Sequence, residues 1–317
     1  LYDQSLELSL LPPMSIAGER APYQRNNIAL GLAWTENAEL DGVMMTMGIN
    51  HTSIRAHGAQ LSMLANVTLG QMQGMQWSQG YNRAGHLRGA QLGMVNSTGG
   101  ALRPEGHPEN QPPPDPEQSG QYYSRGVQLG LINLSSGSFD GLQLGLINVA
   151  DDASAQLGLI SYDRRGGIHP GLSTSELSAV QVDLRFAARK TYTFLTYGVH
   201  PADPGSGWNL RLGMGGRIRF GAKKRGFVDM DVAGGAVFYT LNRIDPPAGL
   251  FRARLMMGFA PYRHLSVYGG ITGSLLVDPP NTTRGSLRPG YQYLTTQVDT
   301  TDVSVSGWPG FVAGVSF

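Results

Sequence analysis

The chain has 317 residues, a net charge of +1 and no cysteine, which excludes a disulfide framework, a cysteine-ligated metal site and a cysteine nucleophile. The balanced charge gives no electrostatic reason to expect a nucleic-acid partner. Glycine is abundant, with 44 residues, and charged residues make up only 15% of the chain, against about 25% in ordinary soluble domains. No run of about 18 apolar residues is present, so the sequence predicts no transmembrane helix. This composition is typical of an all-β protein.

A short strand recurs along residues 42–162, after two strands that we expect at 2–10 and 26–36. Its clearest copies are GVQLGLIN, GLQLGLIN and AQLGLIS, and weaker copies upstream are GVMMTMGIN, GAQLSMLAN, QMQGMQW and GAQLGMVN. The matching glutamines are unevenly spaced, with 13 residues from Gln60 to Gln73 and then gaps of 18, 37, 15 and 13 residues. The largest gap holds a Pro-rich segment, 99–120, which we expect to be a mobile loop. The repeats resemble the GLQLGLIN surface-repeat proteins of bacterial envelopes, a family whose biochemical role is poorly defined.

Two arrangements of the repeats are compatible with their pattern. In the first, each copy is one barrel strand, with leucines such as Leu144 facing lipid while Gln143 and Gly145 face the lumen. In the second, the copies stack in parallel as a small solenoid, with leucines in its core and residues such as Asn133 and Asn148 in a ladder at a corner. The uneven spacing favours the first arrangement, because strands and loops tolerate changes in spacing better than stacked coils do.

The C-terminal half contains longer segments in which apolar and polar residues alternate, as they do along a half-buried strand. We expect strands at 177–188, 191–200, 207–221, 226–241, 249–261, 264–277 and 307–317. These segments of about ten to fifteen residues reach or exceed the ~9–11 residues that a tilted strand needs to cross a bilayer core, and short turns alternate with longer loops between them. Together with the two N-terminal strands and the seven repeat copies, these seven segments give about sixteen strands, an even number as in bacterial outer-membrane barrels. The sequence therefore predicts one antiparallel transmembrane β-barrel over residues 1–317, or alternatively a barrel of eight to ten strands with a repeat β-solenoid.

The end of the chain, GFVAGVSF, places Phe311, Ala313, Val315 and Phe317 on one face of a strand. Together with the long alternating strands, this segment resembles the last strand of bacterial outer-membrane β-barrel proteins. The resemblance implies a location in the bacterial outer membrane, in contact with its lipids and lipopolysaccharide. It also implies that Phe317 is an assembly signal for the barrel-assembly machinery.

Charged residues gather on the expected inward faces of the C-terminal strands. The candidate site residues are Arg185, Arg211, Arg217, Arg219, Arg252, Arg254, Asp183, Asp229 and Asp231. As a functional site, this set is a basic pore lining that favours anionic solutes. As a structural feature, it is an internal ion-pair network that fills a narrow barrel. The number of strands decides between the two interpretations.

The resulting hypothesis is a porin-like passive conduit for small solutes. The alternative is a non-conducting anchor or scaffold subunit of a cell-envelope complex, in which the repeats or the Pro-rich segment bind a protein partner. A barrel enzyme that acts on lipid or lipopolysaccharide is a third interpretation. Because the sequence has no His-Glu-x-x-His motif and no Gly-x-Ser-x-Gly motif, we expect no catalytic residue, no metal and no cofactor.

Overall fold

The structure, a computed structural model, describes residues 1–11, 14–99, 123–199, 207–221, 223–238, 246–262, 264–279, 294–298 and 303–317. Apart from Gly99, the Pro-rich segment 99–120 lies outside these residues. The chain divides into two compact all-β units, Leu1–Arg165 and Gly166–Phe317. Two units therefore replace the single barrel over residues 1–317 that the sequence led us to expect.

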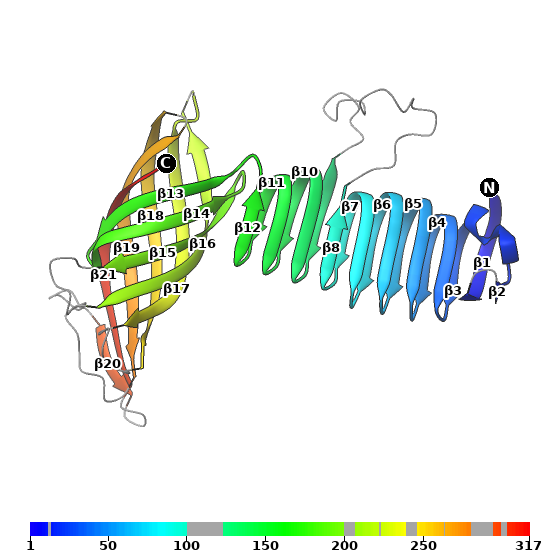
Figure 1. Cartoon of the computed structure of the whole chain (residues 1–317), viewed down its shortest axis with the longest axis horizontal. Coiled ribbons are helices and arrows are strands. Elements are labelled where there is room, and N and C mark those ends of the chain that lie inside the picture. The colour runs from blue at the N-terminus through cyan, green and yellow to red at the C-terminus, as the bar shows by residue number, and fades with distance from the viewer. Residues whose placement is uncertain are drawn as a thin grey trace. The chain divides into compact units, whose positions relative to one another are not determined.

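The first unit is a solenoid built from a largely parallel sheet (Figure 1). Its elements, in chain order, are β1 (Tyr2–Leu11), β2 (Met14–Ser15), the 3-10 helix η1 (Gly18–Tyr23), β3 (Gln24–Gly31), β4 (Trp34–Thr46), β5 (Ile49–Ser62), β6 (Ala65–Ser78), β7 (Tyr81–Leu92), β8 (Val95–Thr98), β9 (Ser124–Leu129), β10 (Ile132–Leu144), β11 (Ile147–Leu157) and β12 (Ile160–Asp163). Apart from the β1–β2 pair, every described pairing in this unit is parallel.

The repeats stack so that each residue lies beside its equivalent in the next coil. Asn50 pairs with Asn66, and Gln60 pairs with Gln76, two positions of the same parallel ladder between β5 and β6. Gln73, which we matched to Gln60 in the sequence, instead pairs with His57 and Arg88. The repeat copies are therefore coils of a solenoid, and the expectation that each is one strand of a sixteen-stranded antiparallel barrel is wrong.

The interior of the solenoid contains two ladders of amide side chains. The asparagine ladder consists of Asn50, Asn66, Asn82, Asn96, Asn133 and Asn148, and the glutamine ladder consists of Gln60, Gln76, Gln91, Gln128, Gln143 and Gln156; all twelve are fully buried. Neighbouring asparagines are joined by N–H···O hydrogen bonds of 2.8–2.9 Å. Neighbouring glutamines are joined by side-chain N–H···O hydrogen bonds of 2.7–2.8 Å. Because an amide both donates and accepts, each ladder pairs its buried amide groups from coil to coil, and Asn50 Oδ1, at the first position of the asparagine ladder, is left without a partner among the described residues.

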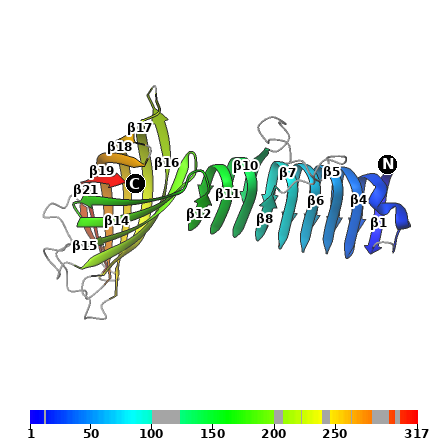
Figure 2. The same cartoon turned by 45° about the horizontal axis from the view of Figure 1, so that its top comes forward.

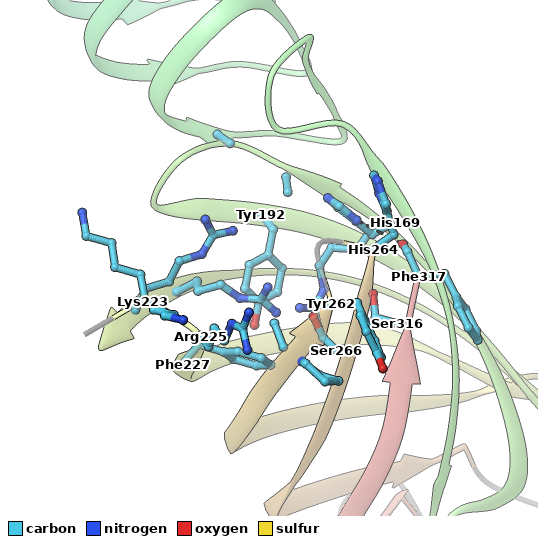
Figure 3. A pocket seen from close by; sticks show the side chains of 18 of the residues that line it. His169, Tyr192, Lys223, Arg225, Phe227, Tyr262, His264, Ser266, Ser316 and Phe317 are labelled. Carbon is cyan, nitrogen blue, oxygen red and sulfur yellow. Dashed lines mark hydrogen bonds between the residues drawn. The ribbon is translucent and has the colours of Figure 1, made fainter. Parts of the chain in front are cut away.

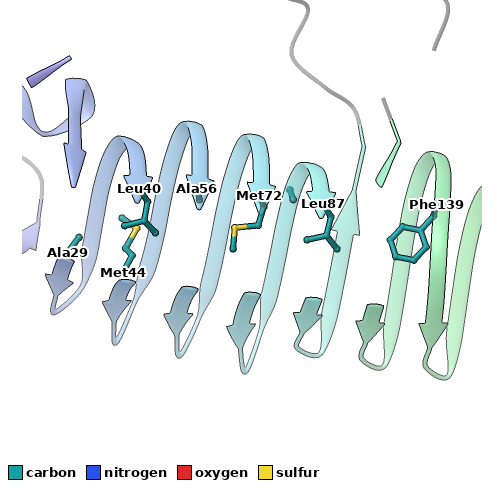
Figure 4. Packing of buried hydrophobic residues seen from close by; sticks show 8 residues of the cluster. Ala29, Leu40, Met44, Ala56, Met72, Leu87 and Phe139 are labelled. Atoms are coloured by element: carbon teal, nitrogen blue, oxygen red, sulfur yellow. The ribbon is translucent and has the colours of Figure 1, made fainter. Parts of the chain in front are cut away.

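Apolar side chains fill another part of each coil. Leu40, Met72, Leu87 and Phe139 belong to one cluster of fully buried residues that runs from coil to coil (Figure 4). The repeat leucines are not among them, since Leu144 is 44% exposed. The prediction that the leucines fill the solenoid core is therefore wrong, because the adjacent glutamine points inward and alternation sends the leucine outward.

A column of glycines permits the bend within each coil. Gly58, Gly74, Gly89 and Gly126 pair in register and have φ between +126° and +147°, where residues with a side chain are strained. A Cβ atom on Gly74 would lie 2.0 Å from the carbonyl oxygen of Gly58. The repeat thus needs glycine at this position for both conformation and space.

The second unit is a closed antiparallel barrel of eight strands (Figures 1 and 2). Its strands are β13 (Ile168–Ser175), β14 (Ser178–Ala187), β15 (Thr191–Val199), β16 (Trp208–Phe220), β17 (Gly226–Phe238), β18 (Ala248–Tyr262), β19 (Leu265–Asp278) and β21 (Val303–Ser316), and β20 (Leu294–Val298) pairs with β21 outside the closed circuit. Pairing of β13 with β21 closes the barrel. The eight strands correspond to the lower strand number of our alternative prediction.

The barrel has an apolar exterior and a polar interior. Large side chains such as Phe251, Met257 and Ile271 are 58–66% exposed on the outside. Their neighbours along the strands, such as Arg252 and Thr272, are buried. The period-two alternation of the sequence therefore predicted correctly which face of each strand points inward.

Candidate functional site

The charged residues predicted from the sequence converge inside the barrel. Arg185, Arg211, Arg252, Arg254, Asp183, Asp229 and Asp231 are each at most 6% exposed. They come from strands β14, β16, β17 and β18, which are consecutive neighbours apart from β15 between β14 and β16. The inward alternation of these strands places the charges in one interior cluster.

Asp229 is the centre of one ion-pair group. Arg217 binds it in a bidentate arrangement, with Nε 2.8 Å from Oδ1 and Nη2 2.8 Å from Oδ2. Arg185 donates to the same carboxylate over 3.0 Å from another strand. The Arg217 guanidinium also lies over the ring of Phe227, 3.9 Å from its centroid. These contacts fix both arginines against a fully buried carboxylate.

Asp231 and Arg254 form a second group. Arg254 donates to both carboxylate oxygens, over 2.7 and 3.1 Å, and the hydroxyl of Tyr192 donates to the same carboxylate over 2.7 Å. The Arg254 guanidinium stacks over Phe194 at 4.3 Å. Charge, hydrogen bonding and aromatic packing thus fill this section of the barrel together.

Glu176 completes the network, and the sequence analysis missed it. It lies in the turn between β13 and β14, and its side chain enters the barrel to accept two hydrogen bonds from Arg252, over 2.7 and 2.8 Å. It also accepts the backbone N–H of Phe311 over 3.0 Å. A turn residue has no alternation to signal an inward side chain, so the only sequence signal was an isolated carboxylate in TSELS, between two strands.

The buried charges are equal in number, and the partly buried Arg217 adds one further cation at Asp229. Four buried arginines, Arg185, Arg211, Arg252 and Arg254, face four buried carboxylates, Asp183, Glu176, Asp229 and Asp231. Arg211 donates to Gln181 over 2.9 Å, and Asp183 accepts from Ser173 over 2.6 Å and from Thr196. Chemically, this arrangement is a packed interior in which Arg185, Arg252 and Arg254 are ion-paired, whereas Arg211 has no carboxylate within 4 Å among the described residues and is held by Gln181.

Two predicted residues lie outside the network. Arg219 is an exposed residue near the end of β16, and among the described residues it has no carboxylate within 4 Å. Phe317 is 51% exposed and follows β21, where its backbone N–H donates to the carbonyl oxygen of Pro170 over 2.8 Å. The structure therefore divides the predicted site into an interior group and an end group.

The solenoid presents a second candidate surface, which we call the apolar edge. It consists of the exposed turn residues Met47, Leu64, Met94, Leu131, Leu146 and Leu159, which are 46–61% exposed. Flanking residues, including Trp77, Leu144 and Ile160, are 42–45% exposed. The repeat segments 42–50, 58–68, 126–139 and 141–150 contain no charged residue. The Gln79–Gly80 turn interrupts this row of apolar turns. An uncharged apolar surface of this kind is uncommon on soluble proteins, so the apolar edge is a candidate interaction surface.

No metal site emerges from the described part of the chain, where no three His, Asp or Glu side chains are grouped to hold an ion. No helix among the described residues has the length and apolarity to span a membrane. In comparisons with protein-family models, curated proteins and solved structures, nothing matches this chain.

Proposed function

We propose that this protein is a non-conducting anchor of the bacterial outer membrane that carries a scaffold solenoid for an envelope partner. The observation that carries the proposal is the interior of an eight-stranded barrel that is occupied by ion-paired side chains, beneath an outer surface that is apolar. The proposal assigns no catalytic step to the chain.

The interior favours an anchor over the porin-like conduit. Barrels of about eight strands are just wide enough for their own side chains to fill. Here three of the buried arginines that would line a pore are paired: Arg254 with Asp231, Arg252 with Glu176, and Arg185 with Asp229. An ion that entered would have to displace these pairs, at a cost of several kcal/mol per exposed charge.

The exterior supports the membrane location. Strands β16 to β19 and β21 have 13–15 residues, more than the ~9–11 that cross a hydrocarbon core. Pairing of β13 with β21 leaves no edge strand in the eight-stranded circuit. A membrane requires this closure, because lipid offers no water to hydrogen-bond the free backbone groups of an edge strand.

Two experiments test the proposal. The detergent-purified chain is reconstituted in planar bilayers, where the anchor gives no current steps; regular single-channel steps would restore the conduit. The chain is then isolated from native outer membranes, where a stoichiometric protein partner is expected. The double variant Leu146→Gln, Leu159→Gln on the apolar edge should lose that partner, whereas Arg88→Gln, an exposed residue of β7, should retain it. Absence of a partner with the wild-type chain refutes the scaffold role.

A further inference from the structure

A cavity of about 450 Å³ lies within the barrel unit, at the end where the strands are joined by short turns (Figure 3). Residues from the β16–β17 turn, the β18–β19 turn and the strand ends beside them line it. Its volume is within the range of small-molecule sites, which is about 300–1,000 Å³.

The lining of this cavity is strongly basic. It includes the side chains of Arg185, Arg217, Arg219, Lys223, Lys224 and Arg225, and no Asp or Glu side chain from the described part of the chain. Asp229, which pairs with Arg185 and Arg217, is the carboxylate that balances this group. Counting six cations against that one carboxylate leaves an excess of five positive charges (6 − 1 = 5).

The cations differ in how firmly they are held. Arg185 and Arg217 are fixed by Asp229, so their remaining N–H groups are preorganised. Arg219, Lys223 and Arg225 are exposed, and within the described residues none has a carboxylate within 4 Å. A fixed inner pair and an unpaired outer group suit a ligand that brings more than one negative charge.

Other lining residues give the cavity its shape. Tyr192, Phe227 and Tyr262 supply aromatic surface, and Ser266 and Ser316 supply hydroxyl groups (Figure 3). The cavity is therefore a mixed site, in which cations can hold an anionic group while rings and hydroxyl groups contact the atoms attached to it.

We propose that this basic cavity binds a phosphate-bearing ligand. A phosphate group carries about 1.5 to 2 negative charges near neutral pH and offers three acceptor oxygens, and guanidinium groups bind it in a bidentate manner. A single carboxylate would neutralise one of the excess charges, whereas a phosphate group neutralises up to about two and each further phosphate adds to this. The ligand can be a free phosphate compound or a lipid headgroup, which share this chemistry. The inference goes beyond the anchor role and does not depend on it, because the cavity lies in one unit and binding is measurable in detergent.

The test uses the full chain in an uncharged detergent at low ionic strength, titrated by calorimetry with pyrophosphate, with dihexanoyl phosphatidic acid and with acetate. Saturable binding of either phosphate probe, with much weaker binding of acetate, supports the proposal. Binding of phosphatidic acid alone identifies a lipid headgroup, and binding of pyrophosphate identifies a free phosphate compound. Absence of binding by both probes, or equal binding of acetate, overturns it.

Matched variants locate the site. Arg219→Gln combined with Lys223→Gln removes two unpaired cavity cations and should raise the dissociation constant about tenfold or more, at roughly 0.7 kcal/mol for each partly screened charge. Lys190→Gln removes one charge from the exposed β14–β15 turn, outside the cavity lining, and should leave binding unchanged. Circular dichroism and thermal unfolding check that all three chains fold. An equal loss of binding in Lys190→Gln would show that general surface charge, and not the cavity, attracts the anion.

Discussion

The inward amides and outward leucines of the solenoid predict opposite effects for two adjacent substitutions. In the coil formed by β10, Gln143 is fully buried and Leu144 is 44% exposed. Gln143→Leu places an apolar side chain inside the ladder, and Leu144→Gln places a polar side chain outside. In an ordinary apolar core, the first change would stabilise the fold and the second would harm it. Here we expect the reverse.

The magnitude for Gln143→Leu follows from its two ladder hydrogen bonds. Gln143 donates to Gln128 over 2.7 Å and accepts from Gln156 over 2.7 Å. A leucine at position 143 leaves the buried side-chain oxygen of Gln128 and the buried side-chain N–H of Gln156 without these ladder hydrogen bonds, at a cost of about 1–3 kcal/mol each. The expected loss is therefore about 2–6 kcal/mol, whereas an exposed substitution such as Leu144→Gln stays within about 0.5 kcal/mol.

Hydrogen–deuterium exchange with peptide resolution on the full chain measures the two effects separately from the barrel. A loss of about 4 kcal/mol corresponds to roughly thousandfold faster exchange in the β10 and β11 amides, if they open locally. Leu144→Gln should change these rates less than about threefold. Equal protection in both variants, or faster exchange in Leu144→Gln, would refute the inward placement of the amides.

Three further substitutions test other parts of the fold. Asp231→Asn leaves Arg254 buried without its carboxylate and should reduce the free energy of unfolding in detergent by about 3–5 kcal/mol; a loss below about 1 kcal/mol would mean that the pair is hydrated. Gly74→Ala combines a φ of +128° with a steric overlap and should unfold the neighbouring coils, as judged by proteolysis, while Gly273→Ala, which has open space, should have no effect. Burial, with a smaller contribution from the charge of Arg88, lowers the pKa of His86 from the usual 6.5. Because the unfolded chain then takes up the proton first, the solenoid should lose stability as the pH falls below 6.5, and His86→Gln should remove that part of the pH dependence.

The barrel was largely predictable from the sequence, because strict alternation over long segments reports both the strand and its inward face. Seven expected strands between 177 and 317 correspond to β14–β19 and β21. The missing strand is β13, whose inward residues are Gly171, Ser173 and Ser175 and whose outward face includes Pro170. Because its inward residues are small and its outward face includes a proline, the sequence of β13 shows little difference in polarity between the two faces. The strand is recognisable only through its pairing with β14 and β21.

The solenoid was harder to predict, because alternation is the same for parallel and antiparallel strands. The uneven glutamine spacing was partly a matter of register: with Gln76 in place of Gln73, the first two gaps become 16 and 15 residues. Those values describe a coil of nearly constant length, with one insertion between Gln91 and Gln128. The stronger signal was the asparagine at the end of most copies, since only parallel stacking places Asn66 beside both Asn50 and Asn82.

The sequence predicted which charged residues point into the barrel, but not which of them pair with each other. Alternation identified the buried arginines and aspartates, whereas the sequence could not show that Arg254 meets Asp231 across the β17–β18 pair or that Glu176 folds inward from a turn. Pairing depends on register between strands, which a single sequence leaves open. The role of a charged interior therefore depends on the number of strands that surround it.

The low charge content of the chain has a physical origin in the stacked coils. Equivalent residues of neighbouring coils lie about 4.8 Å apart, the spacing of strands in a sheet. A column of identical glutamates or lysines at that spacing would place like charges beside each other inside the protein, which is unfavourable in both Coulomb energy and desolvation. A column of identical amides avoids this cost, because Gln91 donates to Gln76 while it accepts from Gln128, and every coil repeats the exchange. Repetition of one coil with a polar interior therefore selects neutral residues that both donate and accept, which is the composition that the repeats show.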